Sequence, residues 1–351
     1  MPDQPRVAIL AEGLFAAATA KTAIGVLRYA PYPVVAVIDS VRAGADSAAV
    51  VGVGNGVPVV ASVAEAIARG ATVLLIGTAA PGGRIPASYR PLLADALGKG
   101  LEVWNGLHER VLADATLRQA AERGGGRVRE LREPPPDLPV GGHRRRRAGT
   151  RVVVTVGSDA AVGKMTVALE LVRAFERAGI RSAFVATGQT GIAIAGSGIC
   201  VDAVVADFIA GAAERMVCDA AETADVIVVE GQGALTHPGF SGVTLGLLHG
   251  SAPDLLVLCH DAARIDVKGF PGLPLMPLRD LVPLYEQAAT WSRVPGASVP
   301  VVAVALNTSA LDAGAAARAI RDAAAETGLP AGDPVREGPG GADRLAAAVS
   351  R

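Results

Sequence analysis

The chain has 351 residues and a formal net charge of −1, so no global field draws it toward nucleic acid or an anionic membrane. Aromatic residues make up only 3% of it, which argues against a protein that stacks bases on aromatic platforms. Its 50% hydrophobic content and 42 glycines are typical of parallel sheets covered by helices on both faces, and the length suggests two domains.

The three cysteines and the apolar segments bear on the cellular compartment. Cys200, Cys218 and Cys259 are widely spaced and form no CxxC pair, so we expect neither a disulfide framework nor a metal site. Met1–Arg6 lacks the pattern of a signal peptide. Ser182–Val201 has no formal charge but contains four glycines, which favours a strand and a Gly-rich loop over a membrane span. We therefore expect a cytoplasmic protein.

Residues 1–130 alternate short apolar runs with Ala-rich helical patterns, which predicts the parallel β-α-β units of a Rossmann-like domain. The expected strands are Val7–Leu10, Val34–Asp39, Val73–Gly77 and Leu101–Trp104, and the expected helices lie near Lys21–Tyr29, Val63–Arg69 and Tyr89–Gly98. Ala11-Glu12-Gly13 stands where a dinucleotide-binding GxGxxG motif would follow the first strand, which weakens a dehydrogenase interpretation. Arg84 follows an expected strand and is a candidate clamp for a substrate carboxylate, although a plain surface turn explains it equally well.

Residues 131–149 differ in composition from both sides. They contain Pro134-Pro135-Pro136, Gly141-Gly142 and the basic run Arg144–Arg147. Segments rich in Pro and Gly cannot support a packed core, so we expect a linker here. Four like charges within such a segment are typical of a solvated tether.

Residues 150–351 restart the strand–helix alternation and predict a second doubly wound domain with a mostly parallel sheet, of the P-loop NTPase-like class. The expected strands are Arg151–Val156, Ser182–Ala186, Val226–Val229, Leu255–Cys259 and Val301–Leu306. The expected helices are Gly163–Ala178, Phe208–Thr223, Asp280–Ser292 and Ala315–Thr327.

The first strand of this domain runs into a candidate phosphate-binding loop, Gly157-Ser158-Asp159-Ala160-Ala161-Val162-Gly163-Lys164-Met165-Thr166. Glycines let successive amide groups converge on phosphate oxygens, the following helix adds a positive dipole end, and Lys164 adds a charge. The loop departs from the usual pattern, because five residues separate its glycines and Met165 stands where Ser or Thr normally binds Mg²⁺. We therefore expect phosphate binding without a bound metal.

Glu230 ends the apolar strand Val226–Val229 and is the first candidate for a catalytic base. Carboxyl ends of parallel strands border the ligand crevice, although an acid there also caps turns. Gly231–Pro253 has no charged side chain, which favours a loop that covers a small molecule. Within it, Gln232 is a candidate substrate contact. His237 is a second candidate base, because imidazole ordinarily titrates near neutral pH, or a structural histidine.

Two further strand ends supply candidates. His260 and Asp261 follow Leu255–Cys259, and Arg264 comes three residues later. We expect His260 and Arg264 to contact substrate. Asp261 is the third candidate for a catalytic residue, or an ordinary turn cap. Asn307 follows the last expected strand, where an amide would contact the base or ribose of a coenzyme, although Asn is also a common helix start.

Gly157–Lys164 and Val228-Val229-Glu230-Gly231 resemble the nucleotide-site motifs of dethiobiotin synthetase and its P-loop relatives. A closer resemblance, to the D-glutamate N-acetyltransferase family, covers nearly the whole chain. It is carried by the phosphate loop through Thr166, Glu230–Gly233, His237-Pro238, Ser241–Gly250, Ala305–Thr308, Val37–Ser40 and Pro81–Arg84. The resemblance implies transfer of an acetyl group from acetyl-CoA to the amino group of D-glutamate or a similar amino acid, without ATP.

Three hypotheses remain open from the sequence. The first is the acyl-CoA-dependent amino-acid N-acyltransferase, with an amino acid and acetyl-CoA as its small-molecule partners, acting as a homo-oligomer without nucleic acid or membrane. The second is an ATP- and Mg²⁺-dependent ligase or kinase of the dethiobiotin synthetase type. The third is a nucleotide-binding regulatory protein. Met165 favours the first hypothesis, because coenzyme A carries phosphates that a loop without Mg²⁺ can hold.

Overall fold

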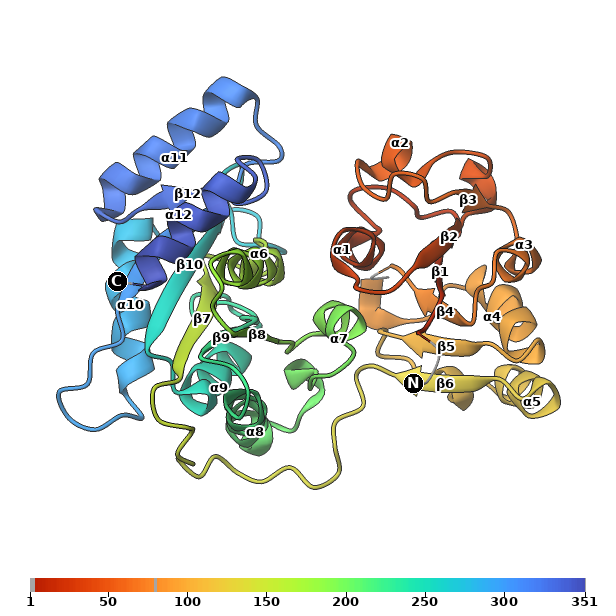
Figure 1. Cartoon of the computed structure of the whole chain (residues 1–351), viewed down its shortest axis with the longest axis horizontal. Coiled ribbons are helices and arrows are strands. Elements are labelled where there is room, and N and C mark those ends of the chain that lie inside the picture. The colour runs from red at the N-terminus through yellow and green to blue at the C-terminus, as the bar shows by residue number, and fades with distance from the viewer. Residues whose placement is uncertain (1–3, 79–80, 351) are drawn as a thin grey trace. The chain divides into compact units, whose positions relative to one another are not determined.

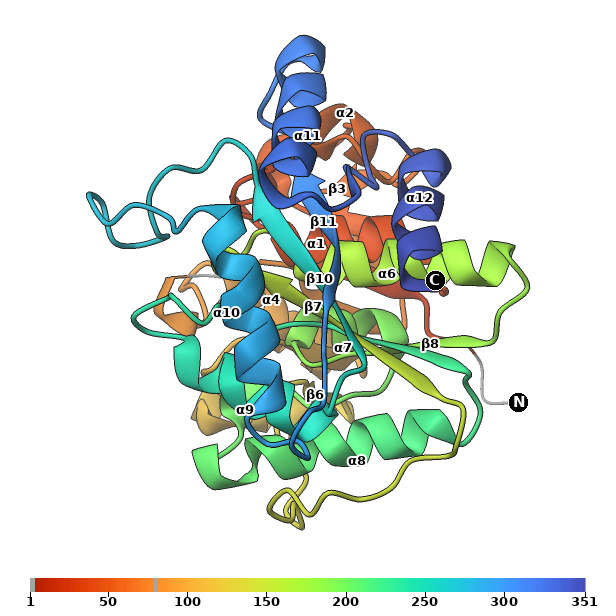
Figure 2. The same cartoon turned by 90° about the vertical axis from the view of Figure 1, so that its left-hand side faces the viewer.

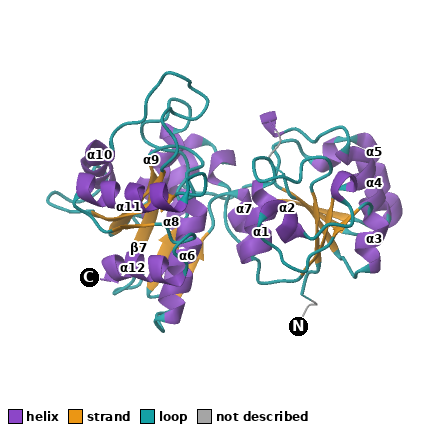
Figure 3. Ribbon diagram, turned by 90° about the horizontal axis from the view of Figure 1, so that it is seen from above, coloured by secondary structure: helices purple, strands orange, loops and turns teal. Residues whose placement is uncertain are grey.

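The computed structural model describes residues 4–78 and 81–350, so the first three residues of Met1–Arg6 lie outside it. The chain divides into two units, each with its own sheet and helices (Figure 1). Unit 1 comprises Met1–Glu133 with Gln189–Ser197, and unit 2 comprises Pro134–Gly188 with Gly198–Arg351. Figure 3 shows the strands of each unit lying among helices, so the predicted α/β fold with two doubly wound sheets is confirmed.

The sheet of unit 1 has six parallel strands in the order β3-β2-β1-β4-β5-β6. The strands are β1 Val7–Leu10, β2 Val34–Ile38, β3 Val59–Val60, β4 Val73–Ile76, β5 Glu102–Asn105 and β6 Arg127–Glu130. The helices are α1 Lys21–Tyr29, α2 Ser47–Val51, α3 Val63–Ala68, α4 Tyr89–Gly98, α5 Ala115–Gly124 and, from later in the chain, α7 Gln189–Ala195.

Both faces of this sheet are covered. On one face Leu10 and Leu74 join a buried cluster with Leu93 of α4 and Leu117 of α5. On the other, α7 packs beside α1. The Tyr32 hydroxyl donates to the Ala193 carbonyl at 2.7 Å, and the Thr22 and Thr190 hydroxyls are 2.8 Å apart. The expectation of a Gly-rich loop after Ser182–Ala186 was wrong here, because apolar side chains at helical spacing give α7 a buried face against unit 1.

The sheet of unit 2 also has six parallel strands, in the order β12-β11-β10-β7-β9-β8. The strands are β7 Arg151–Gly157, β8 Ser182–Val185, β9 Val226–Val229, β10 Leu255–Asp261, β11 Val301–Asn307 and β12 Ala331–Gly332. The helices are α6 Lys164–Arg177, α8 Ile209–Ala221, α9 Ser241–Ser251, α10 Leu278–Thr290, α11 Ala313–Thr327 and α12 Pro339–Ser350.

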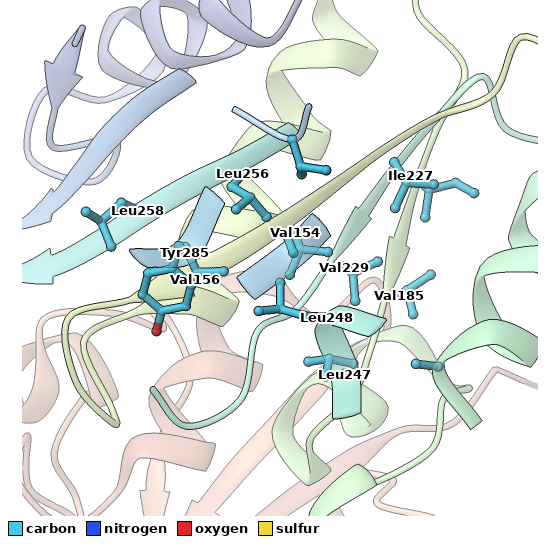
Figure 4. Close-up of a cluster of buried hydrophobic side chains, with 14 of the residues drawn as sticks. Val154, Val156, Val185, Ile227, Val229, Leu247, Leu248, Leu256, Leu258 and Tyr285 are labelled. Carbon is cyan, nitrogen blue, oxygen red and sulfur yellow. The ribbon is translucent and has the colours of Figure 1, made fainter. Parts of the chain in front are cut away.

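Strand β7 shows why this sheet is buried on both sides. Its side chains alternate: Val154 and Val156 pack in a cluster that contains Tyr285 of α10, while Val153 packs with Phe175 of α6 on the opposite face. Figure 4 shows Val154, Val156 and Tyr285 within the first cluster, and Figure 2 shows α10 running along the sheet. The strand, buried from its second residue onward, therefore lies within the sheet between β9 and β10 and leads into the candidate phosphate loop.

Two other expectations need correction. Gly231–Pro253 is not one loop, because Ser241–Ser251 forms α9, which packs against α8. The basic run is not a free tether, because Arg146 pairs with Asp254 at 2.6 Å and Arg147 donates to the Ala221 and Ala224 carbonyls. These three partners of Arg146 and Arg147 lie more than 70 residues further along the chain, so the local sequence gives no sign of these contacts.

None of the described helices is long and apolar enough to cross a membrane. The uncharged stretch that includes Ser182–Val201 is instead divided between β8, α7 and the turns that follow.

Candidate functional site

The candidate site begins at the carboxyl end of β7. In the sheet, β7 lies between β9 and β10, and the chain reaches β8 and β9 on one side of it before crossing to β10 and β11 on the other. This is a topological switch point, where open α/β sheets bind ligands. The loop after β7 leads directly into α6, which begins at Lys164, so the strand–loop–helix context predicted for a phosphate site is present.

The backbone of the loop requires its glycines. Gly163 has φ of +106°, a conformation that side-chain-bearing residues rarely adopt. At Gly157 an added Cβ would lie 2.9 Å from the Lys164 Nζ. The first amides of α6 have no partner within the helix, so their N–H groups and the dipole end favour an anion in the loop.

Lys164 is held against the loop. Its side chain is buried, and its Nζ donates to the Asp159 carbonyl at 2.8 Å. Burial lowers the pKa of Lys164 to about 8, although the negative charges of Asp159 and Glu230 partly offset this by raising it. A phosphate in the loop would give this desolvated ammonium group a counter-charge.

Asp159 and Arg264 brace the loop from within. Burial alone would raise the pKa of the fully buried Asp159 carboxyl, but Arg264 at 2.8 Å and the Lys268 and Ala160 amides outweigh it, and the pKa lies below its usual value. Arg264 also donates to the Ala160 carbonyl at 2.6 Å. Arg264, predicted to contact substrate, is therefore occupied in shaping the phosphate loop.

Glu230 lies on the next strand end, immediately after β9, and is 5% exposed. Its Oε2 accepts the amides of Thr187 and Gly188 at 3.0 and 3.1 Å. Burial raises the pKa of Glu230 to about 7, while these two amides and the Lys164 charge pull it down. A carboxyl group that is half-ionised near neutral pH suits a general base.

His237 has both ring nitrogens engaged by the protein. Nδ1 accepts the Gly239 amide at 3.0 Å, so the proton lies on Nε2, which is 3.2 Å from the Lys268 carbonyl. The ring also stacks on Phe240 at 4.4 Å and meets Phe270 edge-on. A histidine with its donor and acceptor both satisfied is suited to holding the Lys268 loop against Asp159, which favours a structural role over that of a base.

The remaining predicted residues of unit 2 lie at neighbouring strand ends. The side-chain amide of Gln232 donates to the Thr187 hydroxyl. The His260 Nδ1 lies 2.9 Å from the Ser158 hydroxyl, and burial lowers the pKa of His260. Asp261 accepts the Ala263 amide, and Asn307 accepts the Ser309 amide, so each caps a turn. The Asp261 contact matches the turn cap considered from the sequence, whereas Asn307 does not start a helix, because α11 begins at Ala313 with Asp312 as its cap.

Arg84 belongs to unit 1 and is exposed. The pKa of Glu109 is lowered mainly by the Ile85 amide and by Arg90, with a smaller contribution from the Arg84 charge. Its role as a carboxylate clamp stays a prediction.

Several residues that build the site were not identified from the sequence. Tyr285 donates from its hydroxyl to the Gly157 carbonyl at 2.7 Å and accepts the Leu235 amide, which ties the phosphate loop to the chain after Glu230. Thr187 and Gly188 supply the amides that hold Glu230. A single aromatic residue and a Thr-Gly turn carry no spacing signal, so only the packing of distant segments reveals them.

Comparison with known proteins identifies the family. Residues 139–346 match the family model described as the DUF1611 C-terminal P-loop domain, a domain of unknown function, and residues 40–134 match the corresponding N-terminal Rossmann-like domain. The chain belongs to the DUF1611 family. A crystal structure of a family member from Anabaena variabilis is 42% identical, with a TM-score of 0.89 over 99% of both chains.

Two relatives of this DUF1611 chain have names that describe an activity. Proteins named D-glutamate N-acetyltransferase from Tritonibacter scottomollicae and a Pseudoalteromonas species are 38% and 36% identical to it. Each alignment covers 79% of this chain, and 81% and 82% of the relatives. The resemblance predicted from the motifs is confirmed, and these homologues support an N-acetyltransferase function.

Proposed function

We propose that this protein transfers the acetyl group of acetyl-CoA to the amino group of D-glutamate or a similar amino acid. The observation that carries the proposal is its 36–38% identity, over most of both chains, to proteins named D-glutamate N-acetyltransferase. The loop adds physical support, because Lys164 and the first amides of α6 suit a phosphate of coenzyme A. Met165 at the usual Mg²⁺-binding position disfavours nucleotide hydrolysis.

Glu230 is the proposed base. The amino acid arrives as an ammonium ion, whose nitrogen attacks the thioester carbonyl only after losing a proton. The new C–N bond forms as the C–S bond breaks, the nitrogen gives up its second proton to become the amide, and that proton converts the departing thiolate of the coenzyme to the thiol. With its pKa near 7, the Glu230 carboxylate is able to take the proton at neutral pH, and the Thr187 and Gly188 amides hold the carboxylate in place.

The test is a reaction screen on the purified chain. Acetyl-CoA is incubated with the D- and L-forms of glutamate and other amino acids, thiol release is followed, and acetylated products are identified by mass spectrometry. We expect thiol release with D-glutamate or a similar amino acid and no need for ATP. ATP consumption coupled to ligation or phosphorylation, with no thiol release from acetyl-CoA, would overturn the proposal in favour of the ligase or kinase.

A further inference from the structure

Unit 2 contains a cavity of about 680 Å³ that the proposed reaction does not use. It is lined by the basic run after His143, by the middle of α8, by the end of α9 and by the turn after α10. Its volume lies within the range of small-molecule sites, about 300–1,000 Å³.

The cavity lies at the opposite end of the sheet from the phosphate loop. Arg146, one of its lining residues, donates to the Thr150 carbonyl just before β7 and pairs with Asp254 just before β10. The phosphate loop follows the last residue of β7, and a strand of that length spans about 20 Å. The cavity is therefore separate from the Lys164 site.

The wall of the cavity carries excess positive charge. Four arginines line it, against the carboxylates of Glu214 in the wall and Asp254 behind Arg146, which leaves two positive charges in surplus. Glu214 is itself occupied, because it accepts the amides of Gly142 and Arg144. The Glu214 contacts fix the backbone at Gly142 and Arg144, so the chain that carries Arg144 and Arg145 is already held beside the cavity.

Ser251 supplies an independent sign of a ligand. This cavity-lining residue is fully buried, and among the described residues its hydroxyl has no hydrogen-bond partner. A buried polar group without a partner destabilises the fold, so a hydroxyl in this position is expected to meet an external acceptor.

We propose that this cavity binds a small phosphate-bearing anion. Its lining includes Arg144 and Arg145 from the basic run, Ser251 from α9 and Arg293, which also donates to the Pro253 carbonyl, from the turn after α10. Donors that converge from several directions suit a tetrahedral phosphate better than a planar carboxylate, and guanidinium groups bind phosphate oxygens in pairs.

Calorimetry with inorganic pyrophosphate tests the site on the full chain. We expect the parent to need two sites to fit its isotherm, Lys164→Ala to lose one, and Arg144→Gln with Arg145→Gln to weaken the other by about tenfold or more. Arg147→Gln is the matched control: it removes the same charge from the same run, but Arg147 faces the Ala221 and Ala224 carbonyls rather than the cavity. A single site that vanishes with Lys164→Ala, or equal effects of the cavity pair and Arg147→Gln, would overturn the proposal.

Ser251→Ala separates binding from folding. Removing a buried hydroxyl without a partner should leave the melting temperature unchanged or higher, while pyrophosphate binds more weakly. A lower melting temperature with unaltered binding would make the hydroxyl structural and count against the site. Citrate binding as tightly as pyrophosphate would refute the assignment to phosphate.

Discussion

The loops after β1 and after β7 occupy the same place in two similar parallel sheets but differ in what they hold. After β1, the chain's own buried Asp39 accepts the Phe15 and Val41 amides, and the Phe15 side chain is itself buried. After β7, glycines bring the backbone around a buried lysine. A parallel sheet supplies a crevice, and the loop residues decide whether that crevice is filled by protein or kept for a ligand.

The two loops also begin their helices alike, with Lys21 at the start of α1 and Lys164 at the start of α6. Lys21 is exposed and Lys164 is buried. Desolvation therefore acts on the second lysine, whose ammonium group gains most from an anionic partner.

The largest expected effect lies at Glu230, next to the β7 loop. Glu230→Gln keeps an oxygen for the Thr187 and Gly188 amides but cannot take a proton, so we expect turnover to fall by about 10²-fold or more with little change in acetyl-CoA affinity. Steady-state kinetics with calorimetry measures both quantities. His237→Ala should reduce turnover less; a greater loss in His237→Ala than in Glu230→Gln would assign the base to the histidine.

The pH profile of the parent sharpens this assignment. Because the deprotonated carboxylate is the active form, the rate should rise with pH through about 7, the pKa of Glu230. Above about 8 Lys164 loses its proton and coenzyme affinity should fall, unless the bound phosphate raises that pKa. The rising limb should disappear in Glu230→Gln; an unaltered limb in that variant would place the base elsewhere, with Asp261 the next candidate.

Replacing the two helix-starting lysines compares the loops directly. Lys164→Ala should weaken acetyl-CoA binding by about ten- to a hundredfold, because a charge-assisted contact to phosphate contributes roughly 1.5–3 kcal/mol. Lys21→Ala is the control and should leave the affinity unchanged. Calorimetry that finds no change with Lys164→Ala, or equal losses in both variants, would contradict a phosphate site confined to the β7 loop.

Asp39→Asn should affect folding rather than binding. Each oxygen of the buried carboxylate accepts one backbone amide. In asparagine an NH₂ group replaces one of these oxygens and cannot accept a hydrogen bond, so one amide loses its partner and the free energy of unfolding should drop by about 1–3 kcal/mol. Urea denaturation measures this drop, and acetyl-CoA affinity should not change. A loss of affinity at unaltered stability would mean that the β1 loop also serves the ligand.

The smallest expected effect is that of metal removal. Met165 displaces the hydroxyl that usually binds Mg²⁺, so EDTA should leave turnover within experimental error of the untreated enzyme. Activity that EDTA abolishes and Mg²⁺ restores would instead support the ligase or kinase.

The hydrophobic pattern of the sequence predicted most of the strands and helices. Each strand and helix expected from the sequence is present with bounds within two residues of those predicted. Elements with weaker patterns were missed: β6 carries three charged residues among its four, and α9 is rich in glycine. Tertiary packing overrides such local signals, because α9 has α8 as a neighbour and β6 pairs with β5.

The sequence by itself predicted the candidate phosphate loop, its lysine and the acid that follows β9, because strand–glycine–helix periodicity and strand ends are local properties of the chain. Only the tertiary structure decided the roles of Arg264, His237 and the basic run. Arg264 turns inward to Asp159, and His237 is satisfied by two backbone groups. Which partner a long or polar side chain meets depends on segments distant along the chain, and only folding brings those together.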